Sequence, residues 1–312
     1  MKKLYCFALV ILPFFANALE VDIISSFNIE ELPAKLEIVK RVYDVKSICP
    51  TDYFVKRSPY DSNLVKIIVF DPFFNREVIP KLPKEKLVLF IWEPQNFPLE
   101  FYDTYSKVYT WDDSLVDNIK FFRFNYPYLM PFNGNSLRFE EKKLCTLVVG
   151  NWTQQRLNIL KFFEANQPEG LDCYGRRPPE LENTSMWKGA ISGLHSGNEK
   201  ISTLQNYRFC VCFENTIGSH GYITEKIFSC FAAGCVPIYW GAANISDYIP
   251  KTCFIDYRDF RDNEALYKFI STMSQEVYQE YVEEIAKYLK SQQALLFSPQ
   301  FFDNLIYEAI TH

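Results

Sequence analysis

The sequence predicts an α/β protein of two lobes, each built on a parallel β-sheet. Apolar, strand-like runs alternate with helix-like stretches in both halves of the 312-residue chain. Residues 121–135 are interrupted by prolines and a glycine, which favours an extended linker between the halves. With 48% hydrophobic and 17% aromatic residues, the chain can fill two cores. Two such lobes place a cleft between the carboxyl edges of their sheets, where α/β proteins usually bind ligands.

The N-terminus has the features of a targeting segment. Two lysines precede an apolar run over residues 4–16 that is shorter than the ~20 residues a membrane-spanning helix needs. Residues 16–18, Ala-Asn-Ala, have the form of a cleavage site. Residues 1–18 are therefore predicted to be a signal peptide, with an uncleaved membrane anchor as the alternative. This predicts a secretory or cell-envelope protein, Golgi-anchored in a eukaryote if uncleaved, that contacts the membrane only through this segment.

Residues 19–135 are predicted to form the N-terminal lobe. A helix is expected at 29–42, and strands at 21–25, 66–71, 87–92 and 108–110. The strand at 87–92 is apolar on both faces, as in the middle of a parallel sheet, and it runs into Glu93. Asp112 and Asp113 follow the last strand and are predicted to cap a helix rather than to catalyse. A metal role would need an Asp-x-Asp arrangement around a diphosphate, and here the two residues are adjacent.

Residues 136–292 are predicted to form the C-terminal lobe, and 293–312 a C-terminal helical segment. Strands are expected at 144–149 and 171–174, helices at 154–165, 262–273, 275–292 and 299–310, and a long surface loop at 178–200. The most informative element is a strand–loop–helix–strand crossover at 209–241. Its loop lies at the carboxyl edge of the predicted sheet, which makes it the candidate ligand-binding element.

The helix of this crossover has recognisable ends. Thr224 is placed to be its N-cap, Glu225 lies in its first turn, and Gly234 suits its C-cap. Lys226 also lies in the first turn, where a cation opposes the helix dipole. Because a helix N-terminus with a lysine attracts phosphate, an anionic ligand is predicted; a solvated surface lysine is the alternative.

Other polar residues of the crossover each admit two roles. Asn215 follows the buried strand, where it can orient a ligand or begin a turn. Tyr222 is suited to stacking on a ligand or to packing on the helix start, and Glu225 to accepting sugar or ribose hydroxyls or to favouring the dipole. His220 lies in the loop and is expected to be a solvated histidine. No histidine spacing indicates a metal site.

The remaining composition excludes some functions. A net charge of −5 without a long basic run makes nucleic acid an unexpected partner. The nine cysteines form no C-x-x-C pair, and disulfide pairing stays open. The four in the crossover are predicted to be small core residues: Cys210, Cys212, Cys230 and Cys235. Three glycosylation sequons matter only in a eukaryotic secretory pathway: Asn151, Asn183 and Asn244.

The crossover resembles the signature of the α-1,3/4-fucosyltransferase family. The matching stretches are F-E-N at 213–215, Y-I-T-E-K at 222–226 and A-G-C-V-P-I at 233–238. Weaker similarities to the family lie at 90–94, at 149–152 with Arg156, at 174–176, at 248–250 and at 254–260. The resemblance covers most of residues 85–262 and is dense only in the second half.

This resemblance implies two Rossmann-like lobes in the GT-B arrangement, with the active site between them. The second lobe of such enzymes binds GDP-fucose, the first binds an oligosaccharide acceptor, and transfer inverts the anomeric carbon. No cofactor is required, and divalent cations are at most stimulatory. Open alternatives are a GT-B transferase using another nucleotide sugar and a non-catalytic glycan- or nucleotide-binding relative.

The family's roles carry over to particular residues of this chain. Glu93 corresponds to the catalytic base. Arg176 and Lys226 correspond to the cations on the diphosphate, with Arg177 as the substitute if the alignment shifts by one residue. The remaining sugar-nucleotide contacts implied by the resemblance are Asn215, Tyr222 and Glu225. The acceptor sugar, and the choice between its O3 and O4, stay open.

Overall fold

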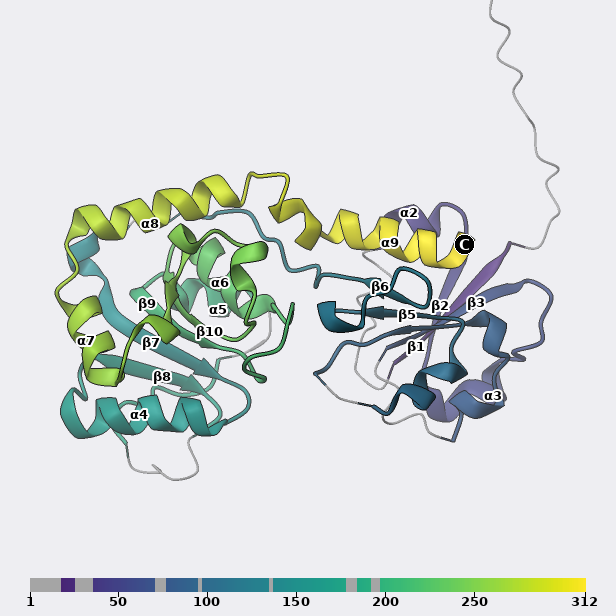
Figure 1. The fold of residues 1–312 in the computed structure, drawn as a ribbon, viewed down its shortest axis with the longest axis horizontal. Coiled ribbons are helices and arrows are strands. Elements are labelled where there is room, and N and C mark those ends of the chain that lie inside the picture. The colour runs from purple at the N-terminus through teal and green to yellow at the C-terminus, as the bar shows by residue number, and fades with distance from the viewer. Residues whose placement is uncertain are drawn as a thin grey trace, which may run out of the picture.

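The computed structural model describes residues 18–25, 36–70, 77–94, 97–134, 137–177, 184–191 and 197–312. Two lobes lie side by side, each containing one parallel sheet (Figure 1). The strand order is β2-β1-β3-β4-β5-β6 in the first sheet and β11-β10-β9-β7-β8 in the second. This confirms the predicted α/β class with two parallel sheets. Several predicted features lie outside the described ranges: residues 1–17 of the targeting segment, residues 29–35 of the first helix, Asp71 at the end of a strand, and Asn183.

The first sheet contains two strands that the sequence did not predict. Its strands are β1 (Glu20–Ser25), β2 (Asp44–Ile48), β3 (Leu64–Phe70), β4 (Leu87–Phe90), β5 (Lys107–Thr110) and β6 (Phe121–Arg123). The unpredicted strands β2 and β6 are the two edges of the sheet. β2 is polar and partly exposed, and β6 is only three residues long within the predicted linker. Neither therefore has the apolar pattern that identifies a buried strand.

Both faces of the first sheet are buried. Ile67 and Val69 of β3 belong to one hydrophobic core, whereas Ile68 and Phe70 belong to the other. This alternation follows from the two-residue period of a strand. The core containing Ile68 and Phe70 is covered by α2 (Glu37–Lys40) and α9 (Pro299–Thr311).

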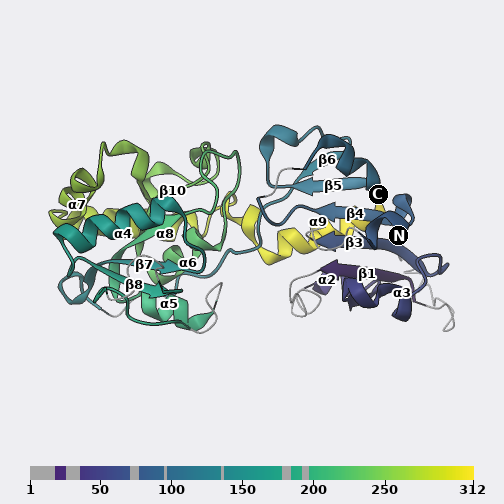
Figure 2. The same ribbon diagram turned by 90° about the horizontal axis from the view of Figure 1, so that it is seen from below.

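Helix α9 returns from the second lobe and packs on the first (Figures 1 and 2). Its Phe302 and Ile306 are buried beside Phe90 of β4. Asp303 is also buried, and its carboxylate accepts hydrogen bonds from the backbone N–H groups of Ile38 (2.7 Å) and Val39 (3.3 Å). These are unpaired donors at the N-terminus of α2, so α9 both covers the sheet and completes the neighbouring helix.

The second lobe is built around the predicted crossover. Its elements are β7 (Lys143–Val149), α4 (Gln154–Asn166), β8 (Leu171–Gly175), α5 (Asn198–Leu204), β9 (Tyr207–Phe213), α6 (Glu225–Ala233), β10 (Val236–Trp240), β11 (Ile255–Asp256), α7 (Asn263–Ser271) and α8 (Gln275–Tyr288). β9 and β10 pair in parallel, with Phe209 opposite Val236. Gly234 ends α6 with φ +62°, as a left-handed C-cap.

The four crossover cysteines are buried in the core of the second lobe, as predicted, and are free thiols. Burial raises the pKa of Cys212 and Cys235, which favours the neutral thiol in both. Across the described ranges, every helix is too short or too polar to cross a bilayer.

Candidate active site

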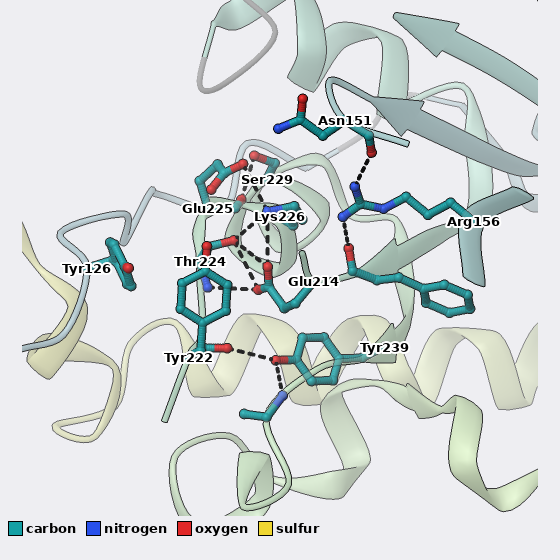
Figure 3. Close-up of polar contacts among 12 residues, drawn as sticks. Tyr126, Asn151, Arg156, Glu214, Tyr222, Thr224, Glu225, Lys226, Ser229 and Tyr239 are labelled. Atoms are coloured by element: carbon teal, nitrogen blue, oxygen red, sulfur yellow. Dashed lines mark hydrogen bonds and ion pairs between the residues drawn. The ribbon is translucent and has the colours of Figure 1, made fainter. Parts of the chain in front are cut away.

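The predicted donor residues gather where β9 ends and α6 begins. Glu214, the residue after β9, is fully buried and lies under the N-terminus of α6 (Figure 3). Its carboxylate accepts hydrogen bonds from the Thr224 backbone N–H at 2.9 Å and from the Thr224 hydroxyl at 2.8 Å. It also accepts one from the Lys226 ammonium at 3.0 Å. Glu214 thus fixes the first turn of the helix; the sequence placed it in the F-E-N stretch but gave it no role.

Lys226 has a carboxylate partner inside the protein. Burial disfavours its charged form, but Glu214 and Glu225 outweigh burial and raise the pKa of Lys226. About a fifth of the side chain (21%) is exposed. A lysine in this position predicted an anionic ligand. In the structure its ammonium lies 3.0 Å from Glu214 and 3.6 Å from Glu225. These two carboxylates account for a cation in the first turn, so the position of Lys226 does not by itself indicate an anionic ligand.

Arg156 connects two loops at the carboxyl edge of the sheet. It lies in α4 and is buried, and its guanidinium donates hydrogen bonds to the backbone oxygens of Asn151 and Phe213 (Figure 3). Burial lowers the pKa of Arg156, while Glu214 opposes that change. Arg156 therefore holds the end of β9 against the loop after β7. Only the family resemblance had drawn attention to it.

Arg176 and Arg177 are both exposed just after β8, but their surroundings differ. The guanidinium of Arg177 lies 4.5 Å from the ring centroid of Trp187, a cation–π contact. Trp152 Nε1 donates to the backbone oxygens of Arg176 (3.0 Å) and Arg177 (3.2 Å). The contact with Trp187 favours Arg176 over Arg177 as the residue available to a ligand.

Tyr222 crosses from the second lobe into the core of the first. Its ring packs edge-to-face against Trp111, with centroids 4.9 Å apart, and against Tyr126 at 5.8 Å. Only 3% of the residue is exposed. The Tyr239 hydroxyl donates to the Tyr222 backbone oxygen at 3.4 Å (Figure 3). Of its two predicted roles, packing is therefore observed, although the contact is with the opposite lobe rather than with the helix start.

Glu93 lies three residues beyond β4 and is half-buried. Burial raises the pKa of Tyr222, and Glu214, Glu93 and Glu225 raise it further. Burial likewise raises the pKa of Tyr128, with contributions from Glu225 and Glu93. The structure thus brings Glu93 of the first lobe and Glu225 of the second close to the same two tyrosines.

The prediction that both acidic residues after β5 cap a helix is correct for Asp112 and wrong for Asp113. Asp112 does cap a short turn, since its carboxylate accepts the backbone N–H two residues on at 3.0 Å. Asp113 instead forms an ion pair with Arg123 at 3.0 Å and accepts hydrogen bonds from Tyr248 at 2.7 Å and from Asn244 at 2.8 Å. Burial opposes its charge, but Arg123 and these donors lower the pKa of Asp113. Arg123 belongs to β6 of the same lobe, whereas Asn244 and Tyr248 lie on the second lobe, too far along the chain for a local pattern to predict.

The remaining predicted residues lie at the same edge of the second sheet. Asn215 is half-buried beside Glu214, and His220 is exposed, as expected for a solvated histidine. Within the described ranges, no group of three or more His, Cys, Asp or Glu side chains is placed to hold a metal ion.

Sequence comparison identifies a family model and relatives that match this chain. Residues 139–299, just over half of the 312-residue chain, match the family model described as "Glycosyltransferase family 10 (fucosyltransferase) C-term". The 4-galactosyl-N-acetylglucosaminide 3-alpha-L-fucosyltransferase 9 of Mus musculus is 30% identical over 132 residues, which are 42% of this chain and 33% of that protein. The alpha-(1,3)-fucosyltransferase FucT of Helicobacter pylori is 40% identical over 72 residues, 23% of this chain and 15% of that protein. The matches thus span a third or less of these curated relatives.

Solved structures resemble both lobes. An alpha1,3-fucosyltransferase with GDP-fucose superimposes with a TM-score of 0.60 at 14% identity, covering 96% of this chain and 93% of that one. A glycosyltransferase from Rickettsia africae ESF-5 gives a TM-score of 0.61 at 13% identity, covering 95% of this chain and 98% of that one. These similarities show the GT-B fold. Together with the match over residues 139–299, they establish that the chain belongs to glycosyltransferase family 10, the fucosyltransferase family.

Proposed function

We propose that this protein transfers L-fucose from GDP-fucose to a hydroxyl group, O3 or O4, of an acceptor glycan. The transfer inverts the anomeric carbon and gives an α-linked fucoside. Membership of family 10 supports the reaction class, and the relatives are described as 3-alpha-L-fucosyltransferases. Because the matches span only part of those relatives, the donor and the acceptor are proposals for this chain.

The observation that carries the proposal is the meeting of the two lobes around Tyr128 and Tyr222. The Tyr126 ring lies between them, with its centroid 5.9 Å from that of Tyr128 and 5.8 Å from that of Tyr222, and it also packs against Trp92 at 5.0 Å. Trp92 immediately precedes Glu93, and Tyr222 lies three residues before Glu225 at the start of α6. A residue suited to activate an acceptor therefore lies near residues suited to hold a donor. Inverting transfer needs this arrangement, because base and leaving group act on opposite sides of the anomeric carbon.

In the proposed reaction, Glu93 accepts the proton of the acceptor hydroxyl as its oxygen attacks the anomeric carbon of fucose. The bond from that carbon to the diphosphate oxygen breaks, and GDP leaves with the bonding electrons. Arg176 and Lys226 stabilise the negative charge that develops on the diphosphate. Lys226 is suited to this role because it is a cation in the first turn of α6, at a helix N-terminus that also attracts a diphosphate. Asn215, Tyr222 and Glu225 are the further proposed contacts with the sugar nucleotide.

The test is transfer of fucose from GDP-fucose across a panel of acceptor glycans, with Glu93→Gln as the key variant. Transfer should fall by about 10²-fold or more, the usual contribution of a general base, while GDP binding survives. Glu100→Gln is the matched control, since Glu100 is an exposed carboxylate of the same lobe. Unchanged transfer by Glu93→Gln would remove Glu93 from the mechanism.

Lys226→Ala and a donor panel test the donor site. The lysine variant should bind GDP more weakly than the wild-type protein. Turnover with GDP-mannose or UDP-glucose and none with GDP-fucose would overturn the proposed donor. A protein that binds GDP and a glycan but transfers from no donor would be a non-catalytic relative.

Two further expectations follow, one on metal ions from the family resemblance and one on residues 1–18 from the N-terminal sequence itself. Transfer should persist in EDTA, with divalent cations at most increasing its rate. N-terminal sequencing and fractionation of the mature protein should show whether residues 1–18 are removed as a signal or kept as an anchor.

A further inference from the structure

We propose that residues of the first lobe hold the donor loop of the second lobe in place. The donor loop is residues 215–222, between β9 and the start of α6; its name rests on the proposed function. The residues that hold it, called the clasp below, come from both lobes: Asp113, Arg123, Asn244 and Tyr248. In this role Asp113 and Arg123 are positioning residues, which act on the donor through the loop.

The clasp binds both polar groups of the Gly221 backbone. Arg123 Nη2 donates to the Gly221 carbonyl oxygen at 3.2 Å, and Asn244 Oδ1 accepts from the Gly221 N–H at 2.9 Å. Asp113 joins these two side chains, because its carboxylate pairs with Arg123 at 3.0 Å and accepts from Asn244 Nδ2 at 2.8 Å. Tyr248 closes the arrangement. Its hydroxyl donates to Asp113 at 2.7 Å and its ring centroid lies 4.7 Å from the Arg123 guanidinium.

The donor loop is shaped for this contact. Gly221 has φ +89°, and a Cβ there would lie 2.3 Å from Arg123 Nη1 and 2.4 Å from the Trp111 carbonyl oxygen. Only glycine allows that backbone conformation and that approach together. The next residue, Tyr222, enters the first-lobe core against Trp111 and Tyr126. Polar and apolar contacts thus attach the same point of the loop to the opposite lobe.

The charged side chains of the clasp are largely buried, so the loss of one is expected to weaken the contact measurably. The side chains of Arg123 and Asp113 are 19% and 27% exposed. A charge held in this setting loses more when its partner is removed than an exposed surface pair does. Asp113→Asn removes the carboxylate that pairs with Arg123. It also replaces one of the two oxygens that accept from Asn244 and Tyr248 with an –NH₂ group, which cannot accept. The loop should then leave the first lobe more often.

This has a consequence for the donor. The donor loop leads directly into Thr224, Glu225 and Lys226 at the start of α6. Release of Gly221 and Tyr222 therefore frees the segment that precedes the proposed diphosphate site. The acceptor lobe would in this way contribute to donor affinity without touching the nucleotide.

The test compares Asp113→Asn, Tyr248→Phe and the double variant with Asp112→Asn. The control suits because Asp112 is the adjacent carboxylate and bonds only within its own turn among the described contacts. Hydrogen exchange of the 217–223 amides, measured without nucleotide, should accelerate roughly tenfold or more in Asp113→Asn. Calorimetric titration with GDP should show a Kd raised by a similar factor of roughly ten. KM for GDP-fucose should rise with kcat largely retained, which a general loss of folded protein would not produce.

The double variant should be hardly worse than Asp113→Asn alone, because the Tyr248 hydroxyl acts through Asp113. Unchanged exchange in the loop, or fully additive effects, would overturn the clasp. Faster exchange with an unchanged Kd for GDP would overturn its link to the donor. If Asp113→Asn does not fold, the same measurements of loop exchange and of the Kd for GDP are made on the milder variant Tyr248→Phe, and they test the clasp by the same criteria. A wild-type protein that binds no GDP overturns the proposed function and the donor link with it, while the exchange data still decide whether the clasp exists.

Discussion

Replacing Glu214 with glutamine should destabilise the second lobe. The change keeps the size of the side chain and an oxygen for the Thr224 backbone N–H. It removes the negative charge opposite Lys226 and turns an –NH₂ group toward two donors, the Thr224 hydroxyl and the Lys226 ammonium. Because Glu214 is fully buried, water cannot replace the lost partner on that side.

The magnitude follows from these contacts. Hydrogen bonds to charged groups contribute about 1.5–3 kcal/mol each, and Glu214 receives one from Lys226 at 3.0 Å. Since 21% of the Lys226 side chain is exposed, water recovers part of its solvation, and the buried-pair value of about 3–5 kcal/mol is an upper limit. We expect the free energy of unfolding to fall by about 2–3 kcal/mol. With an m-value of about 2 kcal/mol/M, the urea midpoint should fall by about 1–1.5 M.

The pH dependence has a definite sign. The pKa of Lys226 is raised in the folded protein, so its contribution to stability is complete below the unfolded lysine pKa of about 10.4. The contribution is lost as pH rises from there through the folded value. The difference in urea midpoint between wild type and Glu214→Gln should therefore be constant from about pH 6 to 9 and shrink above about 10.4.

Lys226→Met provides the second side of a double-mutant cycle. Alone it leaves the Glu214 carboxylate buried without its cation, so it should also be destabilising. The double variant Glu214→Gln/Lys226→Met should be more stable than the sum of the two single losses predicts, by about 1 kcal/mol or more. Additive losses, an unchanged urea midpoint for Glu214→Gln, or a difference that already disappears near pH 8 would refute the reasoning.

Three other predictions concern packing. Gly221→Ala should lower the melting temperature well below that of Gly218→Ala: both have positive φ, but a Cβ meets first-lobe atoms at 2.3 Å only at Gly221. Equal shifts would contradict this. Arg156→Ala strands two backbone oxygens and should cost about 2–4 kcal/mol in urea unfolding; a loss below 1 kcal/mol would be too small. Phe302→Ala should cost about 3–5 kcal/mol and expose first-lobe amides to exchange, whereas the more exposed Phe301→Ala should not.

The sequence predicted best where one pattern dominated. The structure reproduces the apolar strands of the crossover and the glycine C-cap at Gly234. Thr224 is at the N-cap position, but its hydroxyl donates to Glu214 and makes no capping hydrogen bond to the helix. Strands β2 and β6 escaped because edge strands are short or polar, and a pattern of buried residues cannot identify them. Helix α5 was not predicted because it begins at the end of a stretch rich in proline, glycine and serine, a composition typical of a loop.

Local sequence patterns likewise predicted some features of the candidate site and missed others. Local patterns identified Lys226 and Glu225 as candidate site residues. They did not predict that Lys226 pairs with the buried Glu214, because that pairing depends on where strand β9 ends in space. Family resemblance pointed to Arg156 without a role. Asp113 was predicted only to cap a helix and Arg123 was given no role, because Asn244 and Tyr248, which complete their contacts, lie on the other lobe. Contacts between the lobes depend on how one lobe is placed against the other. The hydrophobic periodicity within each half of the sequence carries no information about that placement.

The return of α9 to the first lobe has a consequence for modular design. The chain enters the first lobe, builds the second, and comes back, so the first lobe is encoded at both ends of the sequence. A chimaera made by joining the first lobe of another protein to this chain at the linker alone would keep α9 of this chain. That helix would then pack on the sheet of the other protein. Its Phe302 and Ile306 would then meet a foreign surface, and Asp303 a foreign helix start. Recombination that transplants the first lobe together with residues 299–311 keeps both contacts, whereas a single crossover point does not.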